Sequence, residues 1–335
     1  MARTKIKQRD FIYMSAVLRS RETRLLSGER ISRMLDAAEY DDAAKQLVDC
    51  GYADMSGMNT YKIEDALNAR REAAFAEIAG SGAGSRRIVD VFRLKYDYHN
   101  IKVLVKSMGA NVDASRLLSR SGRVPADTVT EAFISGDRSS LPRPMATVMG
   151  AAVGVLSRTS NPQLADMAID KAYFAELLAL AREAGGDFMA GYARLLIDSA
   201  NLRVYTRAAR TGRDSGFLAE ALLDGGCVPV AELAGLFPSS DGLPSVFAGT
   251  PLAAAAVSAR GAAAGGGQTR FELECDNAAM RYFDGERYAA FGPTVVMTYL
   301  AELEWEISAA RMILTGKLSG MAPDVIRERL RESFV

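Results

Sequence analysis

The sequence is poor in the residues that bind metals or form disulfides. Its 335 residues include one histidine and three cysteines, Cys50, Cys227 and Cys275, which lie far apart and form no Cys-x-x-Cys pair. Zinc sites need three or four ligands, and disulfide frameworks need paired cysteines. The sequence therefore indicates neither kind of site, favours a reducing compartment, and predicts no cofactor and no metal.

The chain also lacks a net charge and a long hydrophobic run. Lysines and arginines number 41, as do aspartates and glutamates, so no basic excess is available for nucleic acid or an anionic membrane. The longest apolar stretch, Met145 to Leu156, has about 12 residues, whereas a membrane span needs roughly 20. Without the pattern of a secretory signal, we expect a cytoplasmic protein with no nucleic-acid partner and no direct membrane insertion.

No catalytic constellation is recognisable. His99 has no nucleophile at a diagnostic spacing, so we interpret it as an ordinary helix residue rather than a general base. The segment Thr315 to Ser319 resembles part of a phosphate-binding loop, but Arg311 occupies the place of the required first glycine and no strand precedes it. We predict no catalytic residues and a protein that is not an enzyme.

Alanine, leucine, arginine and glutamate dominate, and alternating strand patterns are absent, which predicts an all-α fold of about a dozen helices. Clusters of glycine, proline and serine predict the breaks between helices. These breaks are expected at 56–59, 80–85, 136–144, 159–162, 237–244 and 261–268. The Ala- and Gly-rich segment Ala253 to Gly267 is interpreted as a loop.

Three segments of the chain align when three acidic residues, Asp97, Asp198 and Glu306, are superimposed. Apolar residues three and four positions apart then recur on one face of each predicted helix. Two further polar positions repeat in the alignment: Asn100 with Asn201, and Lys102 with Arg203 and Arg311. The third copy carries Ala309 instead of asparagine. Because the basic residue lies five positions after the acid, on another side of the helix, we expect contacts between helices, not within them.

A Gly-x-x-Pro element follows each of these helices, which suggests a tight corner between two helices used three times. We expect the glycine to adopt the left-handed conformation that ends a helix and the proline to begin the next one. The three elements are Gly122 to Pro125, Gly226 to Pro229 and Gly320 to Pro323. The repeat predicts three similar helical-bundle units, spanning 1–121, 122–225 and 226–335.

The last corner opens a helix at Pro323 just before the chain stops at Val335. We expect residues 323–335 to pack on the first unit, which lacks such a preceding helix. The prediction is a closed, pseudo-threefold, funnel-like arrangement.

The most specific resemblance to a known family lies at the C-terminal end. The residues Phe291-Gly292-Pro293, Tyr299, Glu304, Glu306, Arg311, Gly316-Lys317 and Ile326 resemble the end of the C subunit of bacterial and archaeal V-type ATPases and ATP synthases, a relative of the eukaryotic d subunit. The signatures around Asp97 and Asp198, and the start with Tyr13, Arg19, Arg24 and Leu25-Leu26, are similar too. Ala309 departs from the family pattern.

This resemblance implies a non-catalytic adapter of the central stalk. Such a protein seats the central shaft on the membrane proteolipid ring and transmits torque between ATP chemistry and ion translocation. The implied partners are the shaft subunits and the ring, with one copy peripheral to the membrane on its cytoplasmic side, within a hetero-oligomeric complex. The repeated polar residues would then be structural or would contact the shaft. A helical repeat scaffold for other proteins is the alternative, but such repeats have periods of roughly 34 to 45 residues.

Overall fold

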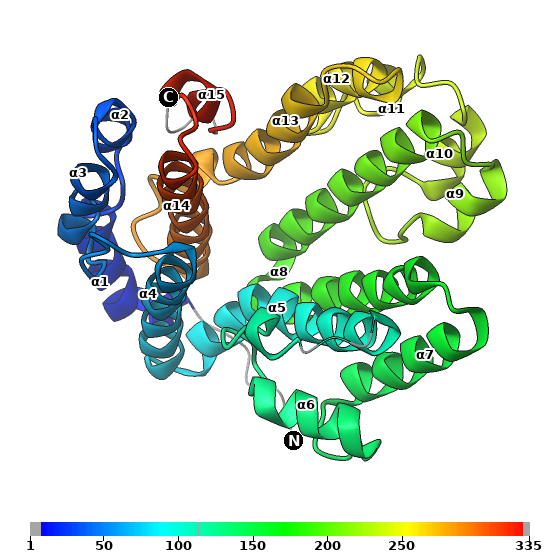
Figure 1. Cartoon of the computed structure of the whole chain (residues 1–335), viewed down its shortest axis with the longest axis horizontal. Coiled ribbons are helices and arrows are strands. Elements are labelled where there is room, and N and C mark those ends of the chain that lie inside the picture. The colour runs from blue at the N-terminus through cyan, green and yellow to red at the C-terminus, as the bar shows by residue number, and fades with distance from the viewer. Residues whose placement is uncertain (1–7, 111, 113, 331–335) are drawn as a thin grey trace. The chain divides into compact units, whose positions relative to one another are not determined.

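The computed structural model describes residues 8–110, 112 and 114–330. Within them every regular element is helical and no strand occurs, which confirms the all-α prediction (Figure 1). By the contacts between its elements the chain forms two compact units, a terminal unit of residues 1–88 and 247–335 and a middle unit of residues 89–246. The division into three units and the pseudo-threefold arrangement remain predictions.

The terminal unit is built around one buried helix, α14 (Pro293–Leu318). Apolar residues occur on every side of this helix, which is the pattern of a helix at the centre of a core. Helices α4 and α1 lie against it, and α12 lies against α13. The other elements of the unit are η1 (Gln8–Phe11), α1 (Ile12–Glu22), α2 (Gly28–Asp36), α3 (Tyr40–Lys45), η2 (Val48–Cys50), α4 (Thr60–Gly80), α12 (Ala253–Ala263), α13 (Gln268–Arg281), η4 (Asp284–Glu286) and α15 (Pro323–Arg327).

The segment interpreted from sequence as a loop, Ala253 to Gly267, contains α12, so that interpretation was wrong. Four alanines of α12, at spacings of one, three and three residues, lie on one face of the helix and are buried: Ala255, Ala256, Ala259 and Ala262. Alanine has the highest helix propensity and lets neighbouring backbones approach closely, so a run of small residues here forms a tightly packed helix. Gly261 lies within α12, and the other three glycines of the segment, Gly265, Gly266 and Gly267, follow the end of the helix.

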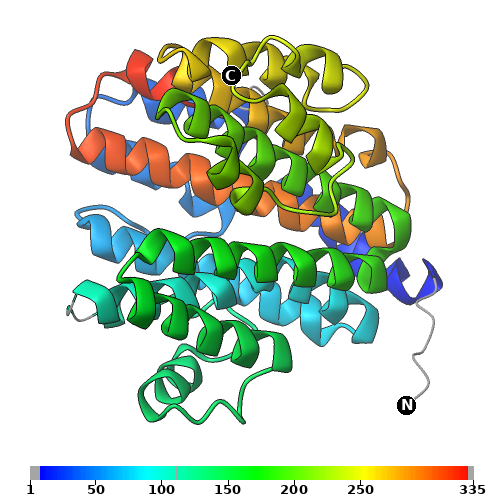
Figure 2. The ribbon, with the colours of Figure 1, turned by 90° about the vertical axis from the view of Figure 1, so that its right-hand side faces the viewer.

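The middle unit contains the longest helical segment, α8 (Pro162–Arg210), with α7 lying against it (Figure 1, Figure 2). Its backbone leaves the helical conformation at Gly185 and Gly186, where φ of Gly186 is 62°, so α8 consists of two helices (Figure 1). Only glycine adopts this conformation readily. The sequence prediction missed this break. The other elements of the unit are α5 (Ala83–Ala110), which begins before residue 89, η3 (Ser115–Leu117), α6 (Ala126–Ser135), α7 (Arg143–Thr159), α9 (Ser215–Ala221), α10 (Val230–Leu236) and α11 (Leu243–Val246).

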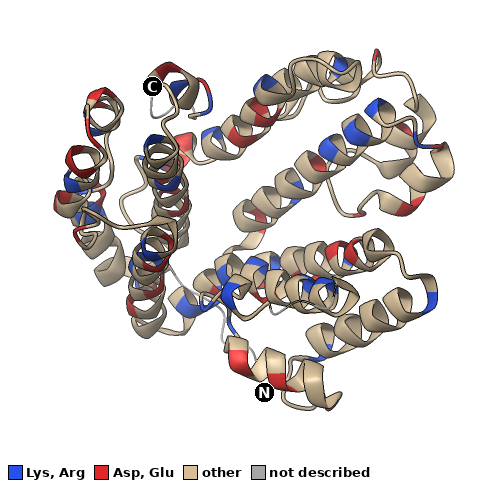
Figure 3. Cartoon of the chain, viewed as in Figure 1, with Lys and Arg blue, Asp and Glu red and all other residues tan. Residues whose placement is uncertain are grey.

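The C-terminal helix α15 contacts α2 in the terminal unit, and Arg327 lies 3.3 Å from a carboxylate oxygen of Asp36. Residues 331–335, which the sequence placed on the same helix, lie outside the described residues. Acidic and basic residues are interspersed along the helices of both units, in keeping with the balanced composition (Figure 3).

No helix among the described residues has the length and hydrophobicity to cross a membrane.

Candidate functional site

The first repeated acid, Asp97, connects α5 to the start of α6. We use the word joint for such a contact, in which a buried carboxylate of one helix binds the backbone just before another helix. Its carboxylate accepts a hydrogen bond from the backbone N–H of Val124 (3.1 Å) and pairs with the Arg123 guanidinium (Nε to Oδ2, 2.6 Å). Val124 directly precedes Pro125, the N-cap of α6. A carboxylate placed there satisfies a buried amide and lies near the positive end of the helix dipole. Burial raises the pKa of Asp97, and the nearby Arg123 opposes that shift.

Asp198 forms the same joint between α8 and α10. Its carboxylate accepts from the backbone N–H groups of Cys227 (2.8 Å) and Val228 (3.2 Å). Val228 directly precedes Pro229, the N-cap of α10, as Val124 precedes Pro125. The first two copies of the sequence repeat therefore place the same chemistry at the same point of the corner. No arginine equivalent to Arg123 is available here, because Cys227 occupies that position.

The corner glycines are required for close approach and not for a left-handed backbone. Neither Gly122 nor Gly226 has a positive φ, so the conformational reason expected from sequence was wrong at both. A Cβ on either residue would lie within 3.0 Å of the carboxylate of Asp97 or Asp198. Each glycine thus leaves the space that its aspartate occupies.

Asn100 and Asn201 make a second matched contact, each binding both backbone groups of one residue in the segment before the corner. Asn100 donates to the carbonyl of Ser119 (2.9 Å) and accepts from its N–H (2.7 Å). Asn201 does the same with Leu223, both at 2.8 Å. An amide side chain is suited to this because it carries one acceptor and two donors.

The third acid, Glu306, closes a joint with the beginning of the chain. Its carboxylate accepts from the backbone N–H of Leu26 and from the hydroxyl of Tyr52, each at 2.6 Å. Leu26 directly precedes Ser27, the N-cap of α2. This is the position that Val124 and Val228 occupy relative to their helices, so the corner equivalent to the first two lies at the N-terminal end of the chain.

The Gly320 to Pro323 corner is of another kind. Gly320 has φ of 68°, no Cβ contact would form there, and the N–H of Met321 donates to the carbonyl of Gly316 (2.9 Å). This is the left-handed end of a helix that the sequence predicted, and Pro323 begins α15. The structure therefore separates the third sequence corner from the first two by its chemistry.

The same comparison accounts for Ala309 in the third copy. Ser119 and Leu223 each lie five residues before the amide that the acid binds, and in the third joint this position is Arg21. Arg21 belongs to α1, and its carbonyl accepts a hydrogen bond from the backbone N–H of Arg24 (2.8 Å). Because the backbone of Arg21 is bonded within the helix and its last turn, it needs no asparagine side chain as a partner. Ala309 is buried instead.

The repeated basic residues extend to other partners. Lys102 pairs with Asp170 (2.6 Å), which joins α5 to the first half of α8, and Arg311 pairs with Glu64 (2.6 Å), which joins α14 to α4. Arg203 donates to the Ser199 hydroxyl of its own helix at 2.5 Å, a contact within a helix that the sequence did not predict. Because these side chains are partly exposed, the pairs contribute modestly to stability.

An ion pair that was not predicted from the sequence joins α4 to α14. Arg71 is 3% exposed, and its Nε lies 3.0 Å from a carboxylate oxygen of Glu304. Glu304 belongs to the C-terminal family signature, but no sequence signal indicates its partner, because only tertiary packing brings Arg71 and Glu304 together.

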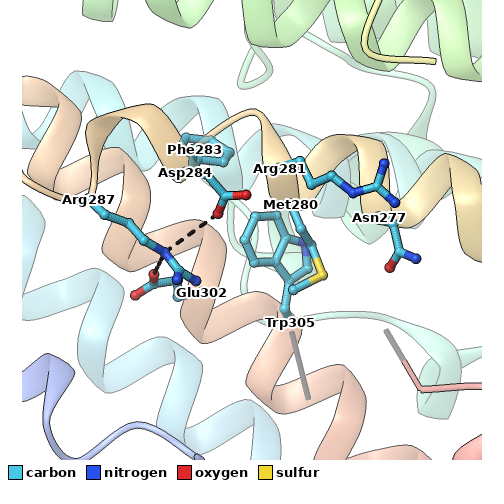
Figure 4. A pocket seen from close by; sticks show the side chains of 8 residues that line it. All are labelled: Asn277, Met280, Arg281, Phe283, Asp284, Arg287, Glu302 and Trp305. Carbon is cyan, nitrogen blue, oxygen red and sulfur yellow. Dashed lines mark ion pairs between the residues drawn. The ribbon is translucent and has the colours of Figure 1, made fainter. Parts of the chain in front are cut away.

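A groove, which we name the Trp305 groove, lies in the terminal unit between α14, α13, η4 and the segment joining α1 to α2. It consists of two adjoining cavities of about 310 and 440 Å³. The residues that line both are Met280, Arg287, Glu302 and Trp305 (Figure 4). Glu302 and Trp305 lie three residues apart and therefore project from the same face of α14.

Glu302 is a carboxylate that lines both cavities of the groove. Burial, with the nearby negative charge of Glu22, raises its pKa to about 7. Arg287 is the cation nearest to it, with Nε 3.9 Å from the carboxylate and 3.6 Å from Asp284 (Figure 4). At neutral pH this carboxyl is therefore poised between its charged and neutral forms.

No cluster of three or more potential metal ligands occurs among residues 8–110, 112 and 114–330. His99 lies 2.9 Å from the carbonyl oxygen of Leu117, an ordinary structural contact.

The structure thus defines a class of protein. It is all-helical, and buried carboxylates on its long helices accept hydrogen bonds from the backbone N–H groups just before three short helices. Residues 14–329 match the sequence model of the ATP synthase (C/AC39) subunit family, and the chain belongs to this family. The resemblance seen in the sequence is confirmed.

Several characterised relatives are similar over nearly their whole lengths. The C subunit of the A-type ATP synthase of Pyrococcus horikoshii is 22% identical over 97% of this chain and 91% of its own. That of Haloferax volcanii is 25% identical, over 95% and 96%, and the C subunit of the V-type sodium ATPase of Enterococcus hirae is 18% identical, over 96% and 98%. Membership in a family of rotary ATPase subunits follows.

Proposed function

We propose that this protein is the non-catalytic adapter of the central stalk in a rotary V-type or A-type ATPase. In this role it seats the central shaft on the membrane proteolipid ring and transmits torque between ATP chemistry and ion translocation. It would be one copy in a hetero-oligomeric complex, peripheral to the membrane on its cytoplasmic side. The observation that carries the proposal is the family match over residues 14–329, with relatives named as the C subunit of A-type and V-type complexes.

The joints support a role in transmitting force. A torque coupler has to resist deformation, and buried charge-assisted hydrogen bonds at helix ends fix where one helix begins relative to another. The carboxylates of Asp97, Asp198 and Glu306 are all at most 1% exposed. The recurrence of one joint chemistry at three acids also supports the predicted threefold organisation.

We propose that the repeated polar residues act inside this protein and do not contact the shaft. The three acids and the two asparagines are buried and hold backbone groups of the same chain. Shaft and ring contacts are then expected from exposed side chains. Substituting an exposed residue that contacts the shaft or the ring should affect assembly without unfolding the protein, whereas substituting a joint residue should affect both assembly and stability.

The adapter role is tested in membranes from cells that lack this chain. We expect ATP hydrolysis by the catalytic head to persist while ATP-driven ion uptake into membrane vesicles is lost, because the shaft is no longer coupled to the ring. Adding back the purified chain should restore uptake. An Asp187→Asn variant, which changes an exposed residue of α8, is the matched control and should restore it equally.

Ion uptake that proceeds at the normal rate without the chain would contradict the proposal. Failure of the wild-type chain to co-purify with shaft and ring subunits from detergent-solubilised membranes would contradict it as well.

A further inference from the structure

The dimensions of the Trp305 groove suit a side chain better than a whole helix. Its two cavities, about 310 and 440 Å³, lie at the lower end of the range for small-ligand pockets, roughly 300 to 1,000 Å³. Both are lined by Trp305 and Met280, which give an apolar, polarisable wall, and both are lined by Glu302 (Figure 4). A long guest side chain would find an apolar wall for its stem and a carboxylate for its end.

The charges of the groove favour a cationic guest. Arg19 is already engaged: one terminal nitrogen donates to both Glu22 oxygens at 2.8 Å and the other to the carbonyl of Ala289 at 2.6 Å. Arg287 is shared between Asp284 and Glu302 at distances beyond hydrogen bonding, 3.6 and 3.9 Å. Within the described part of the chain, Glu302 accepts no hydrogen bond, so its carboxylate lacks a close donor.

Trp305 adds a second feature that recognises cations. The indole is the best aromatic partner for a guanidinium or ammonium group placed over its face. Phe283 meets it edge-on, with ring centroids 5.7 Å apart, which fixes the orientation of the indole. Since Glu302 and Trp305 share one face of α14, a single guest cation can lie over the ring and reach the carboxylate.

We propose that the Trp305 groove is a docking site for a basic side chain, arginine or lysine, presented by a partner protein of the rotor. Only the origin of this side chain rests on the proposed function; the preference for a cation rests on the groove. Arginine is the better guest, because a guanidinium group can stack on the indole while it donates two parallel hydrogen bonds to the carboxylate. Four carboxylates line the groove, those of Glu22, Asp284, Glu302 and Glu306, and an anionic guest would face them. The third arginine of the lining, Arg281, pairs with Glu274 at 3.4 Å.

The sequence provides its own reporter for this site, because Trp305 is the only tryptophan of the chain. We would titrate the purified full chain at pH 8 with butylguanidinium and follow the tryptophan fluorescence. Butylammonium, butyramide and butyrate, at matched ionic strength, test the lysine analogue, the neutral analogue and the anion. The expected result is a saturable fluorescence change with butylguanidinium, a weaker one with butylammonium, and none with the other two.

Two variants make the test specific to the proposed contact. Glu302→Gln keeps the shape and removes the charge, and should weaken butylguanidinium binding at least tenfold. Glu39→Gln, which changes an exposed acid of the same unit, should leave binding unchanged. An absent or unsaturable change, a response to butyrate equal to that to butylguanidinium, or an unaltered affinity in Glu302→Gln would each overturn the proposal.

The pH dependence gives an independent check. Arg19 and Glu22 of α1, Asp284 of η4, and Arg287 surround Glu302, and together they leave its pKa about 7. Because only the ionised carboxylate pairs with a cation, the affinity should fall about tenfold between pH 8 and pH 6. The pH dependence should disappear in Glu302→Gln, and a pH-independent affinity in the wild-type chain would overturn the proposal.

Co-purification from detergent-solubilised membranes separates this inference from the proposed function. If the wild-type chain fails to join shaft and ring subunits, the adapter role fails. If the wild-type chain joins them and Glu302→Gln reduces the recovered rotor several-fold, while Glu39→Gln does not, the groove is a docking site as proposed. Equal recovery of all three chains overturns the docking proposal and leaves the adapter role standing.

Discussion

Replacing Gly226 by alanine tests whether the joint at Asp198 holds the corner before α10. The new Cβ would lie within 3.0 Å of the Asp198 carboxylate, so the carboxylate has to move away from the N–H groups of Cys227 and Val228. Overpacking in a core costs about 1 to 3 kcal/mol, and each hydrogen bond to a charged group contributes about 1.5 to 3 kcal/mol. With partial relaxation we expect a loss of about 3 to 4 kcal/mol.

Hydrogen exchange of the corner amides is the appropriate assay, because a chain with two compact units need not unfold in a single step. A loss of about 3 to 4 kcal/mol corresponds to exchange roughly 10² to 10³ times faster at Cys227 and Val228. The control is Gly235→Ala in α10, where a Cβ meets nothing within 4 Å. That change should slow exchange or leave it unaltered, because alanine favours a helix by about 0.5 to 1 kcal/mol over glycine.

A double-mutant cycle isolates the contact itself. In an Asp198→Ala background the carboxylate is gone, so Gly226→Ala should cost less than about 1 kcal/mol and the two changes should be strongly non-additive. Additive effects would refute the reasoning. So would exchange in Gly226→Ala as slow as in the wild-type chain.

Three further predictions concern other buried polar groups. The pKa of Glu302 is about 7 in the folded chain and about 4.5 when the group is free, so this group lowers the stability of the fold as pH rises from about 4.5 to 7. Glu302→Gln should therefore stabilise the protein by about 3 kcal/mol at pH 8.5 and by well under 1 kcal/mol at pH 4.5, and equal gains in thermal melts at both pH values would contradict this. Asn201→Ala leaves the buried N–H and carbonyl of Leu223 without their side-chain partner, so it should lower the free energy of unfolding by about 2 to 4 kcal/mol. A melting temperature within one degree of wild type would show that the contact between Asn201 and Leu223 contributes little to stability. Arg71→Ala removes the buried guanidinium whose Nε lies 3.0 Å from Glu304, and the loss of this charged hydrogen bond should lower the free energy of unfolding by about 1.5 to 3 kcal/mol. Arg71→Met with Glu304→Leu should recover most of this loss, and a double variant no more stable than Arg71→Ala would show that the ion pair is not the cause.

The repeated sequence signature predicted the first two joints in part. Asp97 and Asp198 were identified as equivalent because their spacing to Asn100 and Asn201 is identical, and their contacts in the structure are equivalent too. Their partners could not be read from the pattern. A carboxylate that binds backbone N–H groups needs no complementary side chain, and Asp198 has none at the position of Arg123, so the feature common to both joints in the sequence is the glycine.

The third joint was hidden because its two halves lie at opposite ends of the chain. Glu306 binds Leu26, 280 residues away in sequence. A search for matched elements downstream of the acid therefore selected Gly320 to Pro323, which has a similar sequence but ends a helix in the ordinary left-handed way. Local spacing cannot reveal a pairing that the chain makes by returning to its start.

The helical class, the family and the equivalence of the three acids were determined by the sequence alone, because helix propensity, periodicity and spacing are local properties of the chain. Tertiary structure decided which amides the acids bind, that Arg71 is buried beside Glu304, and that Glu302 and Trp305 line one groove with Arg19 and Arg287. The physical reason is that the free energy of each polar group depends on how deeply it is buried and on which other segments of the chain lie beside it. Both arise only when distant parts of the chain come together.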